Sequence, residues 1–541
     1  MTVQTDYDAL VIGAGFSGIA TLHFFREAGF KTLVVDKEAE VGGTWWVNNY
    51  PGVRTDSEYP YYSFSFSKEV RDEWDWSERY PTGKEVLAYL KFVVERLDMR
   101  KDMQFNTAVE KAVYNETDKV WEVSLSDGRT LRVKYLVSAM GVLSKPIWPD
   151  IPGREKFKGD MLHAAMWPRE GFDLTGKRVG LIGLGASGLQ ITPTIAPQTK
   201  ELFVFQRTPN FVVAAKSPKT TPEELAHVRA TYDQIWERAA GHPFGVDMVP
   251  AQYSAKEVSE EERRRIFESK WEAGGFHFAN ECFNDLATDH ESAELASEFI
   301  RSKIREIVKD PETAELLCPK DYAFNGKRVP TGFNYYETYN LPHVSLVDVK
   351  TTPITEFTEK GLKVGDKEYE LDVIICATGF DAMTGNLTNL EIVGRNGKVL
   401  REKFAEGYIG GNLGISYNGF PNFLVALGPQ TPYSNLPVPI QLGAEWMADA
   451  ISFARDNGIE ELEATPESEE WWAAETERAG KATVMYEQGK KAKAWFLGDN
   501  VPGKPQQFQV YMGGGQVYQE FCRQAKEDGF RSFRAPELVT A

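Results

Sequence analysis

Short runs of apolar residues, each ending at a glycine, recur along the chain. Residues 9–12 lead into the glycine-rich turn 13–18, and residues 179–182 lead into a second such turn at 183–188. A continuous apolar run of about four residues bounded by glycine is consistent with a parallel strand buried on both faces. Each stretch therefore predicts a strand, a tight turn and a helix, and the first helix is expected over residues 19–28.

The first unit continues with an apolar strand over residues 32–35 that ends at Asp36. Its glycines allow the backbone to approach a pyrophosphate closely, and the helix that follows offers that anion free N–H groups. Asp36 stands eighteen residues after Gly18, where a carboxylate can accept a hydrogen bond from a ribose hydroxyl. The unit predicts a dinucleotide site with a free ribose, such as that of FAD; the alternative is a purely structural turn.

The second unit differs at the position of the acid. Its second strand, residues 201–205, is followed by Gln206, Arg207 and Thr208. A carboxylate there would repel a 2′-phosphate, whereas a guanidinium binds it with charge-assisted hydrogen bonds. This unit therefore favours NADPH over NADH; the alternative is that Arg207 is a solvated surface charge.

The two units belong to an internal repeat. Each is completed by a later buried strand, which ends at Gly141 in the first copy and at Gly379 in the second. Gly141 lies 128 residues after Gly13, and Gly379 lies 196 residues after Gly183. The extra residues lie mainly in 221–319 and contain two capping-box helix starts, at Thr221 and Ser259, and a break at Asp310. They predict a helical domain over a cleft.

The predicted fold class is α/β, with two dinucleotide-binding, Rossmann-like domains of the two-domain flavoprotein type and a helical insert in the NADPH domain. Residues 1–142 and 386–541 are expected to form the FAD-binding domain. Residues 143–222 and 331–385 are expected to form the NADPH-binding domain with its linkers, and residues 223–330 the helical insert.

The segment Phe157–Trp167 joins the two units and must hold their relative position. His163 and Trp167 are four residues apart, which is a same-face spacing on a helix. Taken alone, this pattern predicts a packed aromatic ring beside a hydrogen-bonded histidine.

Charge and cysteine content exclude several classes of function. The net charge of −18 argues against general binding to nucleic acid or to an anionic membrane. The four cysteines are far apart, so neither disulfides nor a metal site is expected. An apolar strand begins at residue 9, which leaves no room for a signal peptide, and no apolar run approaches the roughly 20 residues of a membrane span. We expect a cytoplasmic protein.

The pattern Phe157-x-Gly159-x-x-x-His163-x-x-x-Trp167-Pro168, flanked by the two glycine turns, resembles the fingerprint of type I Baeyer–Villiger monooxygenases. The resemblance covers nearly the whole chain and is greatest to the cyclohexanone and steroid monooxygenase groups. It is specific, because related flavin monooxygenases share both glycine motifs but not the segment between them.

The resemblance implies a reaction, its cofactors and its substrates. FAD and NADPH are the cofactors, and O2 and a small-molecule ketone, cyclic or bulky, are the substrates. NADPH reduces FAD, O2 adds to give an anionic peroxyflavin, and oxygen insertion beside the carbonyl yields an ester or lactone while NADP⁺ stays bound. A monomer or weak homo-oligomer is expected.

The resemblance also implies roles for individual residues. Arg328 matches the arginine that stabilises the peroxide, and Asp56 matches the acid that positions it. Without the resemblance, Lys327 and Arg328 would be interpreted as two exposed charges. The implied FAD contacts are Gly13, Gly15, Phe16, Ser17, Gly18, Asp36, Lys37, Gly43, Thr44, Trp45, Asp56, Tyr62, Val109, Met140 and Leu436. The implied NADP contacts are Arg54, Thr55, Gly183, Leu184, Gly185, Ala186, Ser187, Gly188, Gln190, Arg207, Thr208, Lys327 and Trp495.

The sequence departs from the family pattern at several places. A basic residue expected before Tyr50 is absent from Val47-Asn48-Asn49, and Leu184 replaces a common threonine. Val329-Pro330 and Phe333 stand where a substrate pocket would be lined, so the cyclohexanone preference is not carried over.

Two other functions stay open. One is a related flavoenzyme that oxygenates nitrogen or sulfur, and the other is a redox-sensing flavoprotein without catalysis. For the fingerprint itself, we hypothesise that His163 and Trp167 couple the positions of the two domains.

Overall fold

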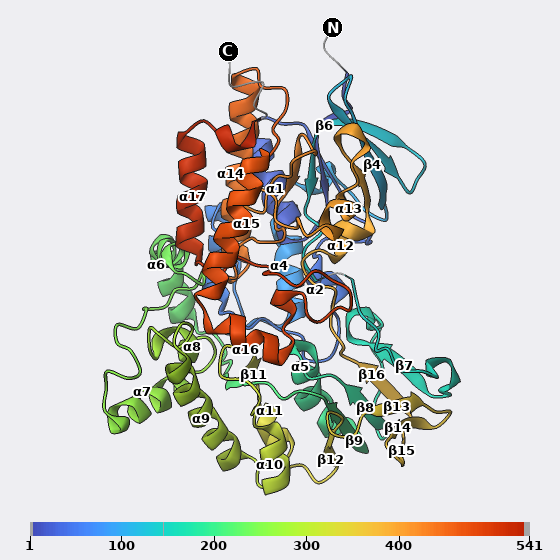
Figure 1. Cartoon of the computed structure of the whole chain (residues 1–541), viewed down its shortest axis with the longest axis vertical. Helices are drawn as coiled ribbons and strands as arrows, with labels where there is room; N and C mark the ends of the chain where they lie inside the picture. Colours follow the sequence, from blue (N-terminus) through green and yellow to red (C-terminus); the bar gives the residue numbers. More distant parts are fainter. Residues whose placement is uncertain (1–3, 144, 535–541) are drawn as a thin grey trace.

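The framework of the molecule is a pair of sheets built mainly from parallel strands, one in the upper and one in the lower half of Figure 1. The computed structural model describes residues 4–143 and 145–534. The upper sheet has the strand order β17-β4-β5-β6-β1-β2-β3, with β18 beside β6. The lower sheet has the order β12-β9-β8-β16-β7.

The upper sheet contains the first predicted nucleotide unit. Its strands are β1 (Tyr7–Ile12), β2 (Thr32–Val35), β3 (Met103–Gln104), β4 (Val109–Asn115), β5 (Val120–Leu125), β6 (Thr130–Ser138), β17 (Glu391–Val393) and β18 (Phe423–Val425). Strand β1 lies between β2 and β6 and is parallel to both, whereas β4, β5 and β6 are antiparallel neighbours. These three strands form a β-meander.

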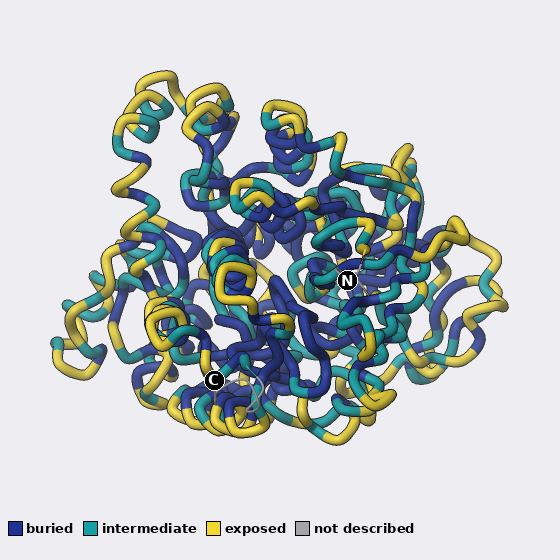
Figure 2. Tube along the Cα trace, turned by 90° about the horizontal axis from the view of Figure 1, so that it is seen from above, coloured by how far each residue is buried: buried dark blue, intermediate teal, exposed yellow. Residues whose placement is uncertain are grey.

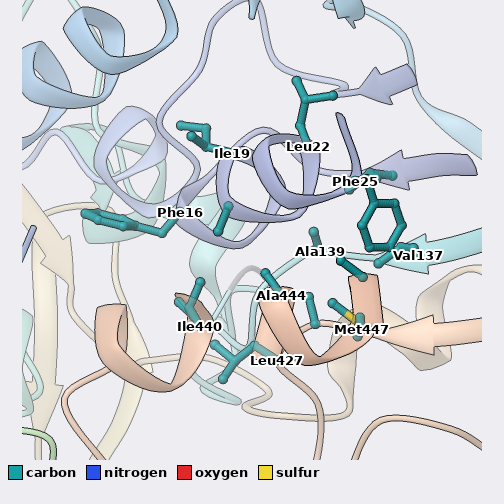
Figure 3. Packing of buried hydrophobic residues seen from close by; sticks show 14 of the residues in the cluster. Phe16, Ile19, Leu22, Phe25, Val137, Ala139, Leu427, Ile440, Ala444 and Met447 are labelled. Carbon is teal, nitrogen blue, oxygen red and sulfur yellow. The ribbon is translucent and has the colours of Figure 1, made fainter. Parts of the chain in front are cut away.

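Helix α1 (Phe16–Glu27) lies between this sheet and α14 (Pro437–Asp456). Ile19, Leu22 and Phe25 are fully buried on α1, and Ala444 and Met447 are fully buried on α14 (Figure 3). The helix begins three residues earlier than predicted, because the turn glycines already take part in its first turn. Burial of α1 against both a sheet and a helix holds the glycine turn at its N-terminus in place.

The lower sheet contains the second unit. Its strands are β7 (Asp160–His163), β8 (Arg178–Ile182), β9 (Glu201–Gln206), β12 (Val344–Asp348) and β16 (Val373–Cys376), all parallel. Helix α5 (Ala186–Ile195) follows β8, as α1 follows β1. A separate antiparallel sheet, β13 (Ile354–Phe357), β14 (Gly361–Val364) and β15 (Lys367–Glu370), precedes β16. The two-unit α/β fold predicted from the sequence is confirmed.

The region predicted to be a helical insert is helical. It contains α6 (Pro222–Gly241), α7 (Glu260–Ala273), α8 (His277–Glu281), α9 (His290–Ile307) and α10 (Pro311–Leu317). Helices α7, α8 and α9 are at the lower left of Figure 1, with α6 above them and α10 at the bottom. Thr221 and Ser259 cap α6 and α7 as predicted, each accepting a hydrogen bond from the backbone N–H three residues on. Asp310 caps α10, so the predicted break separates α9 from α10.

The other helices are α2 (Thr44–Val47), α3 (Lys68–Glu73), α4 (Gly83–Arg96), α11 (Tyr335–Thr338), α12 (Gly385–Asn389), α13 (Leu400–Ala405), α15 (Pro466–Lys481), α16 (Val484–Ala492) and α17 (Gly515–Glu527). Helix α11 packs against α5 and α9 in the lower half. Two further strands, β10 (Val213–Ala214) and β11 (Thr331–Gly332), form a short parallel pair. Buried chain runs through the centre of the molecule, and exposed positions lie at its periphery (Figure 2). Among the helices within residues 4–143 and 145–534, none has the length and apolar character of a membrane span.

The helical spacing predicted for the fingerprint is wrong. Residues 160–163 form β7 at the edge of the lower sheet, and residues 164–166 form one 3₁₀ turn. Pairing of His163 with Cys376 of β16 overrides the local spacing. The packing interpretation is confirmed, because His163 and Trp167 are 2% and 4% exposed.

Candidate active site

The glycine turn of the first unit fits against the end of β6 with no room for side chains. A Cβ atom added at Gly13 would lie 2.5 Å from the carbonyl oxygen of Ala139, and one added at Gly18 would lie 1.8 Å from the oxygen of Gly13. Gly13 also has φ +110°, which L residues rarely adopt. The close packing leaves the N-terminus of α1 directed at the carboxyl ends of the strands, where an anion is stabilised.

The second unit repeats this arrangement residue for residue. A Cβ atom at Gly183 would lie 2.6 Å from the oxygen of Ala377, and one at Gly188 would lie 2.0 Å from the oxygen of Gly183. Ala377 follows β16 as Ala139 follows β6, so the two copies share the same backbone contact. The predicted repeat is therefore a structural one, and both turns fit a pyrophosphate.

Asp36 lies at the end of β2 beside the first turn. Its carboxylate accepts hydrogen bonds from Ala14 N at 2.7 Å and from Glu38 N at 2.9 Å. Burial raises its pKa, and these two bonds oppose the shift. The backbone N–H of Thr107 donates to Asp36 O, which brings the start of β4, with Val109, to the same edge. Lys37, in contrast, has a side chain that is 65% exposed.

Other residues expected at the flavin gather around the same turn. The rings of Phe16 and Tyr62 have centroids 5.5 Å apart, and those of Trp45 and Tyr62 are 5.7 Å apart. The backbone of Gly43 packs against Gly15, where an added Cβ would lie 3.0 Å from the Gly15 Cα. Leu436, the residue before α14, packs against the same apolar cluster. These contacts form a wall that fits a flat aromatic ring system.

The NADPH side is tied to the FAD side through Gln190 of α5. Its Oε1 atom accepts from the hydroxyl of Tyr50 at 3.0 Å and from Arg54 N at 3.4 Å, and its Nε2 donates to Arg54 O at 3.1 Å. Arg54 in turn lies over the ring of Phe333, 4.4 Å from its centroid. The loop before Asp56 is thus bound to both units.

Arg207 and Lys327 form a cationic pair at the end of β9. Burial and, to a smaller extent, the charge of Arg207 lower the pKa of Lys327 to about 8. Within the described part of the chain, neither forms an ion pair with a carboxylate. Two cations held together without a carboxylate favour an anion between them, which fits a 2′-phosphate.

Arg328 and Asp56 meet between the two units. Arg328 Nη2 donates to Asp56 Oδ2 at 2.5 Å, and Thr331 Oγ1 donates to Asp56 Oδ1 at 3.2 Å. Asp56 has a side chain that is 7% exposed, whereas that of Arg328 is 35% exposed. The acid is therefore buried, and the guanidinium is the more accessible partner of the pair.

Two tyrosines complete the surroundings of Arg328. Burial of Arg328 disfavours its charged form, but the charge and hydrogen bond of Asp56, together with the two phenols, outweigh burial, and the pKa of Arg328 is raised. The phenols of Tyr433 and Tyr62 lie close enough to act in the same direction, and burial raises the pKa of Tyr433 to about 12. Thr331 and Tyr433 were not singled out from the sequence; their proximity in sequence to Arg328 and Leu436 is the only signal that could have indicated them.

Two linkers join the units, the first linker containing Ile147 and the second containing Gly379 to Met383. His163 lies where these two linkers run side by side. Its Nε2 atom is 3.2 Å from Ile147 O, and its Nδ1 accepts from Ala165 N at 3.1 Å. Ile147 N also donates to Gly379 O at 2.9 Å. Burial lowers the pKa of His163, and an Nδ1 that accepts a hydrogen bond carries no proton, so His163 is neutral.

Trp495 begins a short 3₁₀ turn that packs on the second linker. Its side chain belongs to an apolar cluster that includes Met383 of that linker. Lys504 Nζ contacts Asp381 Oδ1 at 3.0 Å, and Asn500 Nδ2 donates to Phe380 O at 3.0 Å. The C-terminal segment is therefore docked over the path between the units.

A guanidinium does lie beside the Trp46–Asn49 loop, although the sequence indicated none there. It belongs to Arg169, just after the fingerprint, which lies 3.3 Å from the centroid of the Trp46 ring and donates to Trp46 O at 2.6 Å. Asn49 Nδ2 donates to Pro168 O at 3.2 Å. The fingerprint thus contacts the FAD side directly.

Comparison with known proteins decides the family. Residues 8–243 match the family described as flavin-binding monooxygenase-like. A Baeyer–Villiger monooxygenase of Pseudooceanicola batsensis is 41% identical over 98% of this chain and 96% of its own length. The chain belongs to the Baeyer–Villiger monooxygenase family. It is an enzyme that uses FAD and NADPH, as the resemblance implied.

Solved structures of Baeyer–Villiger monooxygenases and their relatives agree with this assignment. The closed crystal structure of cyclohexanone monooxygenase is 41% identical, with a TM-score of 0.93 over 97% of this chain and 98% of that one. The complex of OTEMO with FAD and NADP is 38% identical, with a TM-score of 0.94 over 98% and 99%.

One relative carries a different activity in its name. Phenazine N-monooxygenase PhzNO1 of Lysobacter antibioticus is 40% identical over 98% of this chain and 97% of its own length. Overall similarity therefore does not separate the Baeyer–Villiger enzymes from this N-monooxygenase. Only the chemistry of the site can distinguish the two reactions.

Proposed function

We propose that this enzyme inserts one oxygen atom of O2 beside the carbonyl of a cyclic or bulky ketone and releases an ester or lactone. The observation that carries the proposal is the Asp56–Arg328 pair between the two nucleotide units. A fixed cation at that place stabilises negative charge that develops on oxygen during attack on a carbonyl.

FAD and NADPH, when bound, supply the reducing equivalents and the activation of O2. The chain's own contribution at the reaction centre is electrostatic. Arg328 stays charged at any working pH, and its raised pKa reinforces this. Asp56 holds one edge of the guanidinium and is itself oriented by Thr331, so the guanidinium is held in place without reorganisation.

The cofactor contacts are proposed from their positions. Gly13, Gly15 and Gly18, with Asp36, would hold the pyrophosphate and ribose of FAD. Gly183, Gly185 and Gly188 would hold the pyrophosphate of NADPH. Arg207, Thr208 and Lys327 would bind its 2′-phosphate, and Trp495 would cover its nicotinamide. The domain boundaries, the cytoplasmic location and the monomeric or weakly associated state expected from the sequence remain proposals of the same kind.

Oxygenation of nitrogen or sulfur is the second candidate, supported by the phenazine N-monooxygenase among the relatives. In that reaction the oxygen atom acts as an electrophile, and stabilising an oxyanion with Arg328 helps less. The Asp56–Arg328 pair therefore favours the ketone reaction.

Product analysis with purified enzyme tests the two candidates. A panel of cyclic, linear and steroid ketones is compared with amines, a phenazine and sulfides, under NADPH and O2. The expected result is ketone-dependent NADPH consumption with an ester or lactone as product. NADPH oxidation that yields only hydrogen peroxide with every ketone, or product from the heteroatom compounds alone, would contradict the proposal.

A further inference from the structure

Residues 56–58 hold two interactions from different parts of the chain. Asp56 binds Arg328, and two residues later the carboxylate of Glu58 contacts His277 of the helical insert. The two contacts lie on one short loop, so the backbone that carries Glu58 also carries Asp56.

His277 stands between two carboxylates. Its Nε2 atom is 3.1 Å from Glu58 Oε1, and its Nδ1 atom is 2.9 Å from Glu281 Oε2. The side chains of His277, Glu58 and Glu281 are 22%, 18% and 12% exposed. An ionised carboxylate only accepts hydrogen bonds, so both ring nitrogens must donate, and His277 must be an imidazolium.

The neighbouring groups are consistent with a charged histidine. Lys270 Nζ, on α7, binds Glu281 Oε2 at 2.8 Å, and Tyr80 OH, on the FAD side, donates to Glu58 Oε1 at 3.4 Å. Hydrogen bonds from His277 to Glu281 and to Glu58 raise its pKa to about 9. With His277 charged, two cations face two anions; without its proton, one negative charge is left over.

The approach of the insert to this loop is close. A Cβ atom added at Gly275, just before α8, would lie 2.1 Å from Tyr80 OH. Ser57, between the two binding residues, donates to Asn435 Oδ1 at 2.7 Å, and Asn435 Nδ2 donates to Gly245 O of the insert at 3.0 Å. The insert therefore holds the loop through two separate contacts.

We propose that His277 is a positioning residue for the reaction: as an imidazolium it ties the helical insert to Glu58 and so keeps Asp56 in register with Arg328. The proposal rests on the role given above to Arg328. A lost proton leaves His277 with one N–H for two carboxylates, so the tie to Glu58 weakens, the loop loosens and NADPH consumption runs without oxygen transfer.

The test compares His277→Phe, which cannot donate, with His277→Gln, which donates but does not titrate. His227→Gln, at an exposed position on α6, is the matched control. Ester formed per NADPH consumed is measured between pH 7 and 10, together with FAD content and the rate of flavin reduction by NADPH under anaerobic conditions.

For the unmodified enzyme and the control, coupling is expected to fall as the pH rises through about 9. His277→Phe should lose coupling about tenfold at every pH, since a hydrogen bond to a charged group is removed, while FAD content and flavin reduction are retained. His277→Gln should recover part of the coupling and show no fall near pH 9. Unchanged coupling and an unchanged pH profile in both variants would overturn the proposal. An unmodified enzyme that forms no ester would instead contradict the proposed function.

Discussion

Arg328 and Asp56 are 272 residues apart in the chain, yet Arg328 Nη2 lies 2.5 Å from Asp56 Oδ2. Asp56 belongs to a loop of the FAD side, and Arg328 follows the last helix of the insert. The pair can form only when both parts are docked, so the reaction centre depends on the arrangement of the whole molecule.

Replacement of Arg328 by alanine should abolish ester formation while leaving part of the flavin reduction by NADPH. Loss of one preorganised charge-stabilising group costs about 10²–10³ in turnover. Single-turnover kinetics separate the two steps. Thr331→Val, which removes only the second hydrogen bond to Asp56, should give a smaller loss. Retained oxygenation in Arg328→Ala would remove Arg328 from the mechanism.

Arg207→Ala should raise the KM for NADPH far more than the KM for NADH, because only NADPH has the 2′-phosphate that Arg207 is proposed to bind. Steady-state kinetics with both nucleotides check this. A loss equal for both would show that Arg207 does not bind the phosphate.

Binding of NADPH should weaken as the pH rises through about 8, where Lys327 loses its proton. A bound phosphate favours the charged lysine, so binding takes up a proton, and the NADPH Kd should rise by up to about tenfold per pH unit. Titration calorimetry or fluorescence between pH 7 and 9.5 measures the effect. NADH is the control and should show no such dependence, and Lys327→Arg should abolish it. The same pH dependence for NADH would contradict the prediction.

Gly183→Ala should weaken NADPH binding strongly while FAD remains bound. The new Cβ would lie 2.6 Å from the oxygen of Ala377, in addition to the strain of φ +100°. Gly171→Ala is the matched control, because Gly171 has φ +86° and nothing within 4 Å of an added Cβ. Equal effects of the two substitutions would attribute the loss to backbone strain alone.

His163→Ala should reduce coupling or NADPH affinity with FAD still bound, because it removes the hydrogen bond from His163 Nε2 to Ile147 O in the first linker. Burial lowers the pKa of His163, so this effect should not change between pH 7 and 9. FAD content, the KM for NADPH and ester yield are measured together. Unchanged kinetics would leave the segment with a packing role only.

The sequence by itself determined the two nucleotide units, their order and the cofactors expected for them. Local rules suffice there, because every signal of a unit lies within about 25 residues. The signals are the apolar strands, the glycines at positions where a Cβ cannot fit, and the acid or arginine at the end of the second strand. The capped starts of α6 and α7 are of the same kind, since a cap acts within one turn.

The tertiary structure alone decided the contacts between residues that come from distant segments of the chain. Pairing with β16 made the fingerprint a strand and not a helix, because ladder hydrogen bonds and burial outweigh local spacing. The contacts of Thr331 with Asp56, Arg169 with Trp46 and His277 with Glu58 follow from docking of the insert and linkers on the FAD side. Side-chain contacts across such interfaces depend on packing and charge in three dimensions, which no periodicity along the chain records.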